Sequence, residues 1–303
     1  MAVGAAVGFA AVLGIYCIEL TTVQRDYFLE RRGAVAEVSR QPQEAASGER
    51  VLQDVTLVSS SGLRVDMRVL RPAESPGDKL PTVLLVNGKR TGKYAVDLLD
   101  RPGNVAFAAI EYPYHGPPHV QGLWQTLAAM PAIQRAVLDT PPALMLAVQW
   151  LATQPWADPR QIELAGISLG VPFAAAAGAI EERISRVWLV HGGASNLPWA
   201  ELHLQSKIEH ATIRRLIARL TLLLIYSASF DTLAWIEEIA PRPVIVVSAR
   251  HDESVPQGFA LADAADAGSA EVIWTEGPHI RSSREQELQK LFDIFRSRVE
   301  NDR

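Results

Sequence analysis

The sequence is almost without cysteine. Its single cysteine, Cys17, lies in the first apolar segment. A disulfide within the chain is therefore excluded, and so is a cysteine nucleophile or a cysteine-based metal site in the rest of the protein. The sequence also has no internal repeat and no low-complexity tract.

Basic residues do not outnumber acidic ones. The 29 Lys and Arg stand against 34 Asp and Glu, the formal net charge is −5, and no basic stripe is present. Nucleic acid is therefore not expected as a partner. The 303 residues are 48% hydrophobic and 21% charged, which is an ordinary globular composition. This length suits one α/β domain of about 250 residues with an appendage.

The first 18 residues, MAVGAAVGFAAVLGIYCI, carry no charged side chain. About 17 to 20 apolar residues are the minimum that crosses a bilayer. The sequence therefore predicts a transmembrane anchor helix over residues 1–24, with membrane contact through residues 1–20. Three basic residues follow the run, Arg25, Arg31 and Arg32. They favour a cytoplasmic body, but Asp26 and Glu30 lie among them and leave the side of the membrane open.

Three alternatives to an anchor are weighed against the same segment. A cleaved signal peptide needs a positive residue before the run and a small-residue cleavage site soon after it, and neither is present. A lipoprotein signal needs small residues before the cysteine, where this chain has Tyr16. An N-terminal helix docked on a soluble protein is the alternative that stays open.

Beyond the first segment the chain divides into a linker and a globular part. Residues 25–49 are charged and then rich in Gln, Glu, Ala, Ser and Gly, which predicts a stalk that leads into a linker. Two strand patterns follow over 51–58 and 63–69 and predict an antiparallel hairpin. Short apolar runs typical of buried strands then alternate with helical patterns. These runs are 82–86, 105–110, 162–165, 187–190, 243–247 and 272–274.

Strands that alternate with helices predict a mostly parallel sheet with helices on both faces, here over residues 50–303. The clearest helix begins at Thr140, because a capping threonine followed by two prolines is a start signal. The last helix covers 283–299. The stretch 196–240 interrupts the alternation with amphipathic helical patterns and predicts a small helical cap. Ordinary packing helices are the equally favoured alternative, and whether the cap gates a site stays open.

Gly166-Ile167-Ser168-Leu169-Gly170 matches G-x-S-x-G. The pattern follows the strand 162–165 and precedes an alanine-rich helix over 171–180, and this strand–turn–helix context is what the motif requires. A serine at such a turn has a strained backbone and an exposed hydroxyl, and small residues two positions away on each side leave room for it. Ser168 is therefore the candidate nucleophile, and a buried serine between glycines is the alternative.

A serine needs a base to take its proton, and the base needs a carboxylate to orient it. The expected chain order is Ser, Asp or Glu, His. His279 follows the sixth strand in a Gly-Pro loop, where the sites of parallel sheets gather, and is the candidate base. Asp252 follows the fifth strand and is the candidate acid, with Glu253 as its rival. The other later histidines, His203, His210 and His251, are expected on the surface or beside the acid.

Two backbone N–H groups are expected to bind an oxyanion. Leu169, directly after the nucleophile, supplies one. The other is expected from the loop after the first buried strand, at Lys89, with Gly88 as the fallback. No metal is expected.

These residues together resemble the α/β-hydrolase superfamily, over about residue 50 to the C-terminus. The stretches Asp158-Pro159-Arg160-Gln161-Ile162 and Ile239-Ala240-Pro241-Arg242-Pro243-Val244 look closest to its dienelactone-hydrolase and peptidase-like branch. The resemblance implies an α/β-hydrolase fold, a triad of Ser168, Asp252 and His279, and acyl transfer to water without a cofactor. One departure is Asn87-Gly88, where many members have His-Gly.

The expected function is hydrolysis of an ester-type bond in a small acyl substrate, through an acyl-enzyme intermediate. A peptidase or thioesterase with the same triad is one alternative. A non-catalytic α/β-hydrolase-like binding protein is another, because this superfold hosts many functions. The apolar cap favours an apolar acyl group. The sequence does not fix the oligomeric state.

Overall fold

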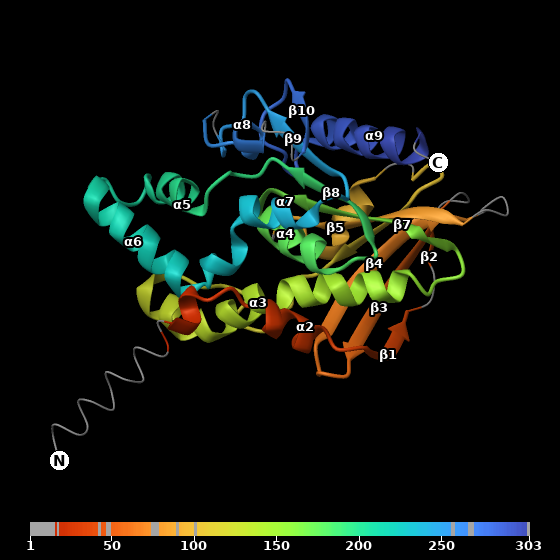
Figure 1. The fold of residues 1–303 in the computed structure, drawn as a ribbon, viewed down its shortest axis with the longest axis horizontal. Helices are drawn as coiled ribbons and strands as arrows, with labels where there is room; N and C mark the ends of the chain where they lie inside the picture. The colour runs from red at the N-terminus through yellow and green to blue at the C-terminus, as the bar shows by residue number, and fades with distance from the viewer. Residues whose placement is uncertain are drawn as a thin grey trace, which may run out of the picture.

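The computed structural model describes residues 16, 18–41, 44–46, 50–73, 79–88, 91–99, 102–255, 258–265 and 270–301. One sheet runs through the molecule, and helices cover both of its faces (Figure 1). Its strands are β1 (Val35–Arg40), β2 (Glu44–Ala46), β3 (Arg50–Ser59), β4 (Arg64–Pro72), β5 (Leu80–Val86), β6 (Ala106–Ile110), β7 (Ala157–Ile167), β8 (Ile184–Val190), β9 (Val244–Ala249) and β10 (Glu271–Thr275).

The strand order is β1-β3-β4-β6-β5-β7-β8-β9-β10, with β2 paired to β3. The strands from β6 to β10 pair in parallel, whereas β1 to β4 pair antiparallel and β4 joins β6 antiparallel. The predicted mostly parallel sheet and the predicted hairpin, here β3 and β4, are confirmed. Every residue of β5 is buried, as expected for a strand covered on both faces.

The helices are α2 (Arg25–Arg32), η1 (Gly92–Leu98), α3 (Gly122–Leu151), η2 (Ser168–Gly170), α4 (Val171–Ile180), α5 (Asn196–Leu204), α6 (Ala211–Leu224), η3 (Ser227–Phe230), α7 (Thr232–Ile239), α8 (Leu261–Ala265) and α9 (Glu285–Asn301), where η marks a 3₁₀ helix. Alternate residues of β5 enter different cores. Leu84 and Val86 pack with α3, α4 and α7, whereas Val83 and Leu85 pack with η1 and α9. This alternation follows from the two-residue period of a strand.

Residues 25–40 differ from the predicted stalk and linker. Helix α2 buries Phe28 completely in the core, and β1 extends the sheet beside β3. Arg31 contacts both carboxylate oxygens of the buried Asp139 on α3, at 3.0 Å each. Arg25 and Arg32 also form ion pairs with the body, to Glu238 and Glu181. The charged residues that suggested a linker are therefore the ones that hold α2 in place.

Helix α3 begins at Gly122, so the predicted start at Thr140 is wrong. Pro131, Pro141 and Pro142 all lie inside the helix. A proline interrupts the helical hydrogen bonds, and a threonine hydroxyl can donate a hydrogen bond to the carbonyl oxygen one turn earlier in the helix. Here Thr140 Oγ1 donates to the carbonyl of Ala136 at 2.6 Å. The second half of the helix is buried almost throughout, and this burial offsets the lost backbone bonds.

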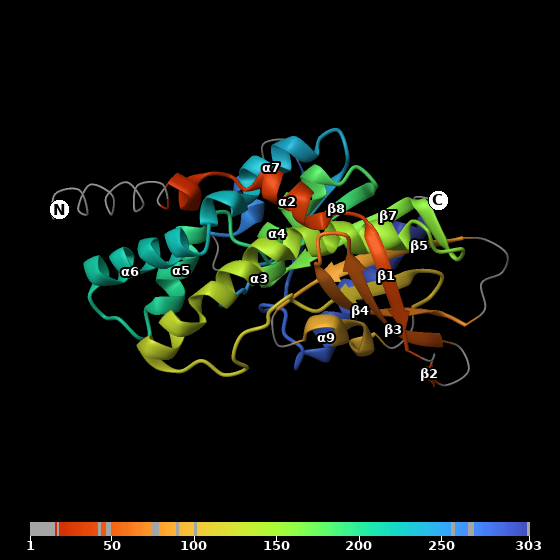
Figure 2. The same ribbon diagram turned by 90° about the horizontal axis from the view of Figure 1, so that it is seen from below.

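The region predicted as a cap, 196–240, contains α5, α6, η3 and α7. Helices α5 and α6 stand out from the body at one end of the molecule (Figures 1 and 2). Helix α7 instead packs on α4 and buries Trp235, Ile236 and Ile239 in the core. The part that projects from the body is therefore α5 and α6.

Within the described residues, no helix combines the length and the apolar character that crossing a membrane requires. Residues 1–15 and Cys17, which make up most of the predicted anchor 1–24, lie outside the described residues. The chain from Ile18 onward contacts the body: Leu20 is buried, and the backbone N–H of Gln24 donates to Ser229 Oγ at 3.0 Å.

Candidate active site

Ser168 lies at the tight turn between β7 and α4. Its φ is +54°, a left-handed conformation that side chains other than glycine rarely adopt. The flanking glycines make the turn possible. A Cβ on Gly166 would lie 2.6 Å from the Cβ of Ala174, and one on Gly170 would lie 2.0 Å from the carbonyl oxygen of Val86. The turn therefore packs directly on helix α4 and on the end of β5, with the Ser168 side chain facing outward.

His279, from the loop after β10, reaches the serine. Its Nε2 lies 2.9 Å from Ser168 Oγ, and its Nδ1 lies 2.7 Å from Asp252 Oδ2. A carboxylate can only accept a hydrogen bond, so Nδ1 carries the proton and Nε2 is free to accept the serine proton. His279 and Asp252 are both buried. The structure thus brings the three residues into one hydrogen-bonded chain.

Asp252 is fixed by its own loop. Its Oδ1 accepts hydrogen bonds from the backbone N–H groups of Ser254 and Val255, at 2.8 and 2.7 Å. These bonds leave Oδ2 directed at His279. Of the two carboxylates weighed from the sequence, it is Asp252 that contacts the imidazole.

Glu253 instead holds the backbone of the histidine loop. Its Oε2 accepts the backbone N–H of His279 at 3.0 Å, while Arg284 donates to the carbonyl of His279 at 2.6 Å. Arg284 and Arg281 both pair with Glu253 Oε1 at 2.9 Å. Burial raises the pKa of Glu253, but the hydrogen bonds, chiefly from Arg284, outweigh it and lower that pKa to about 2. This ionised carboxylate positions His279 through its main chain.

His191, a second buried histidine, was missed by the sequence analysis. It follows β8 directly, with φ +52°, and its ring lies 5.5 Å from that of His279. His191 Nδ1 accepts the backbone N–H of Ile280 at 3.1 Å and lies 3.5 Å from Asp252 Oδ2. Its place at the end of a buried strand, before Gly192-Gly193, is the signal that points to it.

Burial, followed by the charge of His279, lowers the pKa of His191 to about 4. The unfolded chain binds this proton near pH 6.5, so it is protonated before the folded protein as the pH falls. The free energy of unfolding should therefore decrease by about 2 kcal/mol between about pH 7 and pH 5 through this group alone. Urea unfolding of the protein and of His191→Asn at both pH values measures this decrease in the free energy of unfolding. Asparagine is chosen because it can still accept the Ile280 N–H and does not titrate.

The matched control is His251→Asn, whose histidine side chain is 73% exposed and should leave the pH dependence unchanged. The quantity that tests the assignment is the difference in the pH dependence of unfolding between the protein and His191→Asn. Identical pH slopes for these two proteins would contradict the assignment of a buried, neutral His191.

His191, Asp252 and His279 also have the donor types and the spacing of a metal site. Their hydrogen bonds fit another use. His191 Nδ1 is occupied by the Ile280 N–H, and the proton on His279 Nδ1 is occupied by Asp252. The arrangement is that of a proton-transfer chain and does not require an ion.

Two of the three residues predicted for the oxyanion site are described. Leu169 directly follows Ser168 in η2, at the beginning of a helical segment, where N–H groups have no partner within the helix. Gly88 lies just beyond β5, with open space where a Cβ would be. Lys89, the predicted second donor, lies outside the described residues. The side-chain oxygen of Asn87, which directly precedes Gly88, is buried without a hydrogen-bond partner among the described residues.

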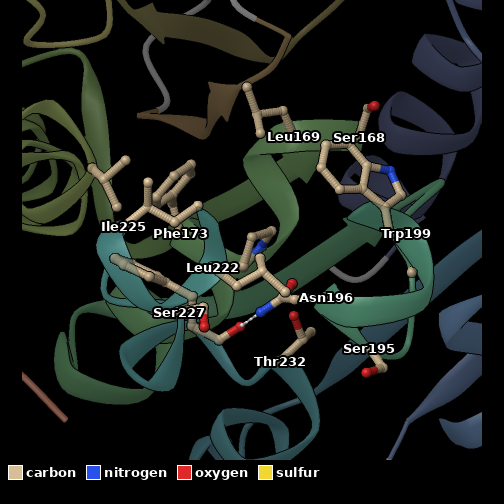
Figure 3. A pocket seen from close by; sticks show the side chains of 14 residues that line it. Ser168, Leu169, Phe173, Ser195, Asn196, Trp199, Leu222, Ile225, Ser227 and Thr232 are labelled. Carbon is tan, nitrogen blue, oxygen red and sulfur yellow. Dashed lines mark hydrogen bonds between the residues drawn. The ribbon is translucent and has the colours of Figure 1, made fainter. Parts of the chain in front are cut away.

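A pocket of about 130 Å³ opens beside Ser168. Figure 3 shows Ser168 and Trp199 on one side of it and Phe173 and Ile225 on the other. Most of its wall is apolar, and Leu222 of α6 and Trp199 of α5 contribute to it from the projecting helices. Asn196, Ser227 and Thr232 add polar groups. The pocket can therefore receive an apolar group next to the serine hydroxyl.

The remaining candidate histidines lie away from Ser168. His203 is exposed, and its Nδ1 lies 2.8 Å from the carbonyl oxygen of Trp199. His210 is exposed at the start of α6, and the nearest charged partner of His251 is Glu276.

No family model and no curated protein sequence matches this chain. Solved structures do match. An acetyl xylan esterase from Paenibacillus sp. R4 is 17% identical, with a TM-score of 0.60 over 89% of this chain and 92% of that one. Acetyl xylan esterase 1 from Thermoanaerobacterium sp. JW/SL YS485 is 14% identical, with a TM-score of 0.56 over 90% and 94%.

A cold-adapted esterase from an Arctic intertidal metagenomic library is 18% identical, with a TM-score of 0.53 over 83% of this chain and 96% of that one. At these identities the likeness concerns the architecture. The parallel sheet, the turn at Ser168 and these neighbours agree with the resemblance found in the sequence, and the chain has the fold of the α/β-hydrolase superfamily.

Proposed function

We propose that this protein is a serine hydrolase that cleaves carboxylic esters through an acyl-enzyme intermediate. The observation that carries the proposal is the continuous chain of hydrogen bonds from Asp252 through His279 to Ser168. A serine hydroxyl becomes a nucleophile when an adjacent base accepts its proton, and the base here has its own orienting carboxylate. That the neighbours in fold are esterases supports an ester as the substrate.

In the first half of the reaction, Ser168 Oγ forms a bond to the carbonyl carbon while its proton moves to His279 Nε2. The electron pair of the C=O bond moves to the oxygen, which the N–H of Leu169 and a donor from the loop at Gly88 stabilise. Each such donor lowers a barrier by about 3 to 4 kcal/mol. When the carbonyl re-forms, the bond to the alkoxide breaks, and His279 gives it the proton, so an alcohol leaves.

In the second half, water takes the place of the alcohol. Its proton moves to His279 Nε2 as its oxygen attacks the acyl carbon, and the proton then returns to Ser168 Oγ as the carboxylic acid leaves. Asp252 stays ionised in both halves and stabilises the imidazolium.

The bond type is tested by a panel of an ester, a thioester and an amide that share one acyl group. We expect kcat/KM to be highest for the ester. A clear preference for the amide or the thioester would move the proposal to the corresponding hydrolase while keeping the same three residues. No turnover of any of the three by the folded protein would contradict it.

The apolar wall of the pocket favours an apolar acyl chain of several carbons over acetate. Leu222 of α6 lines the pocket, so Leu222→Trp should fill part of it. We expect kcat/KM for a nitrophenyl hexanoate to fall at least about tenfold in this variant, because losing the contacts of a few methylene groups lowers transition-state binding by that factor. The acetate should be little affected.

The control for this prediction is Ile213→Trp, which enlarges an exposed side chain on the same helix and should leave the chain-length profile unchanged. A protein that clearly prefers acetate, or a Leu222→Trp variant with an unchanged profile, would contradict this use of the pocket.

The predicted anchor remains part of the proposal for the uncharged start of the chain, whereas the residues from Leu20 onward pack on the body. It is supported by the absence of charge in residues 1–18 and by the length that a bilayer requires. In this arrangement the hydrolase body is tethered to a membrane, on a side that the sequence leaves open.

A further inference from the structure

Helix α6 exposes an apolar stripe to solvent. Ile213, Leu216, Ile217 and Leu220 are between 37% and 57% exposed, and their spacing of i, i+3, i+4 and i+7 puts them on one face of the helix. The opposite face carries the buried Ala218 and the pocket residue Leu222. The helix is therefore apolar on the side that points away from the protein, which is the reverse of an ordinary surface helix.

Two other segments expose apolar side chains at the same end of the molecule. The first turns of α3 expose Leu123, Leu127 and Trp124, the last at 81%. Ile18, at the start of the described chain, is also exposed. Figures 1 and 2 agree in placing α6, the beginning of α3 and residues 18–21 at the end from which α5 and α6 project. We call Ile18, Leu123, Trp124, Leu127 and the α6 stripe the cap-end surface.

The chain that precedes this surface indicates what covers it. Residues 1–18 carry no charge, and they join the body beside the cap-end surface, where Gln134 Nε2 donates to Tyr16 OH at 2.9 Å. If the uncharged start of the chain is a membrane anchor, as proposed, the end that carries the apolar side chains is the end that faces the bilayer. A second copy of the chain would cover the same surface but would leave the uncharged segment unexplained.

The charge of α6 fits an anionic lipid surface. The helix contains Arg214, Arg215 and Arg219 and no acidic residue. Arg215 pairs with Glu201 of α5 at 2.7 Å, and Arg214 donates to the carbonyl of Ile208 at 3.1 Å, so part of this charge is balanced within the protein. Basic residues beside an apolar face and an exposed tryptophan are typical of helices that lie in the plane of the membrane interface. With 14 residues, α6 is too short to cross the hydrocarbon, so its contact with a membrane would lie along the surface.

We propose that the cap-end surface rests on a lipid bilayer, with the α6 stripe inserted at the interface. This contact is additional to the predicted anchor and does not depend on catalysis. One consequence rests on the proposed function: since Leu222 of α6 and Ile225, directly after this helix, line the pocket, an amphiphilic ester could enter the pocket from the lipid.

The test places a nitrobenzoxadiazole fluorophore on the stripe of the full chain. Cys17→Ser removes the single native cysteine, and Ile217→Cys provides the labelling site. Vesicles of phosphatidylcholine with about one quarter phosphatidylglycerol should shift the emission to the blue and raise its intensity. The control is Val38→Cys, exposed on the edge strand β1, whose label should not respond. Binding of the chain to vesicles without a response at position 217 would overturn the proposal.

Vesicle-free protein provides a second check. A label at position 217 that already reports an apolar environment would overturn the proposal. If that fluorescence signal changed with protein concentration, a second copy of the chain would cover the stripe. If it did not change, another segment of the same chain would cover it.

A pair of variants separates apolar contact from charge. Leu216→Asp with Leu220→Asp should lower the vesicle affinity at least about tenfold, as measured by flotation. Thr212→Asp with Thr221→Asp adds the same charge to exposed positions of the same helix and should lower it much less. Circular dichroism checks that both proteins are folded. Equal affinities for the two variants would overturn the proposal.

Discussion

Replacement of Ser168 by alanine should lower kcat/KM for a nitrophenyl ester by about 10⁴-fold or more, because losses of this size follow removal of an attacking serine from a Ser-His-Asp triad. Alanine has no oxygen to form the acyl bond, and water is a poor substitute without it. The fold should be preserved, since the φ of +54° strains alanine no more than serine. Initial rates over a range of substrate concentrations measure the effect, and thermal unfolding checks the fold.

Ser195→Ala is the matched control, because Ser195 lines the same pocket, whereas the ring nitrogens of His279 are paired with Ser168 and Asp252. It should change kcat/KM by less than about tenfold, as expected for a residue that contributes only to binding. Comparable activity of Ser168→Ala and the unmodified protein would show that another group carries the reaction.

Asp252→Asn should have the second largest effect, a decrease in kcat of about 10⁴-fold, the loss that the same change causes in a serine protease triad. The asparagine oxygen can still accept the N–H groups of Ser254 and Val255. Its NH₂ group would then face His279 Nδ1 and donate to it. The imidazole would be held in the tautomer that carries its proton on Nε2, which cannot take the proton of Ser168.

Glu253→Gln distinguishes this effect from a general loss of negative charge. Glu253 binds the backbone of His279 and two arginines but does not contact the imidazole. We expect a decrease of no more than about tenfold, because glutamine can still accept the backbone N–H. If Glu253→Gln were as damaging as Asp252→Asn, the distinction between the two carboxylates would fail.

The sheet and the side chains Ser168, Asp252 and His279 were predictable because both depend on local patterns in the sequence. Strand β5 is recognisable as an uninterrupted apolar run, and Ser168 as the centre of a glycine-flanked turn. The order of the chain then limits Asp252 and His279 to the ends of the last two strands, where a parallel sheet gathers its loops. That these side chains lie close together could be predicted without knowing how the helices pack.

The features that the sequence did not predict depend on contacts between distant segments. Phe28 and Arg31 look like parts of a charged linker until Asp139 and the core of α3 are placed beside them. Helix α3 continues through Pro141 because the burial of its neighbours offsets the lost hydrogen bonds. His191 was overlooked because its role depends on the backbone of Ile280, which lies 89 residues away along the chain.

The outward-facing stripe of α6 shows the opposite situation. Its helical period was visible in the sequence, but which face points to the body was not. In the structure Ala218 is buried and Leu222 lines the pocket, whereas Leu216 and Leu220 on the other face are exposed to solvent.

The most direct test of the central claim is the mass of the intact chain after treatment with a fluorophosphonate, which reacts with serines that an adjacent base activates. We predict a single phosphonyl adduct, located by peptide mapping at Ser168. It should be absent in Ser168→Ala and form much more slowly in His279→Ala. A folded protein in which Ser168 stays unmodified, or in which His279→Ala reacts at the same rate as the unmodified chain, would contradict the account.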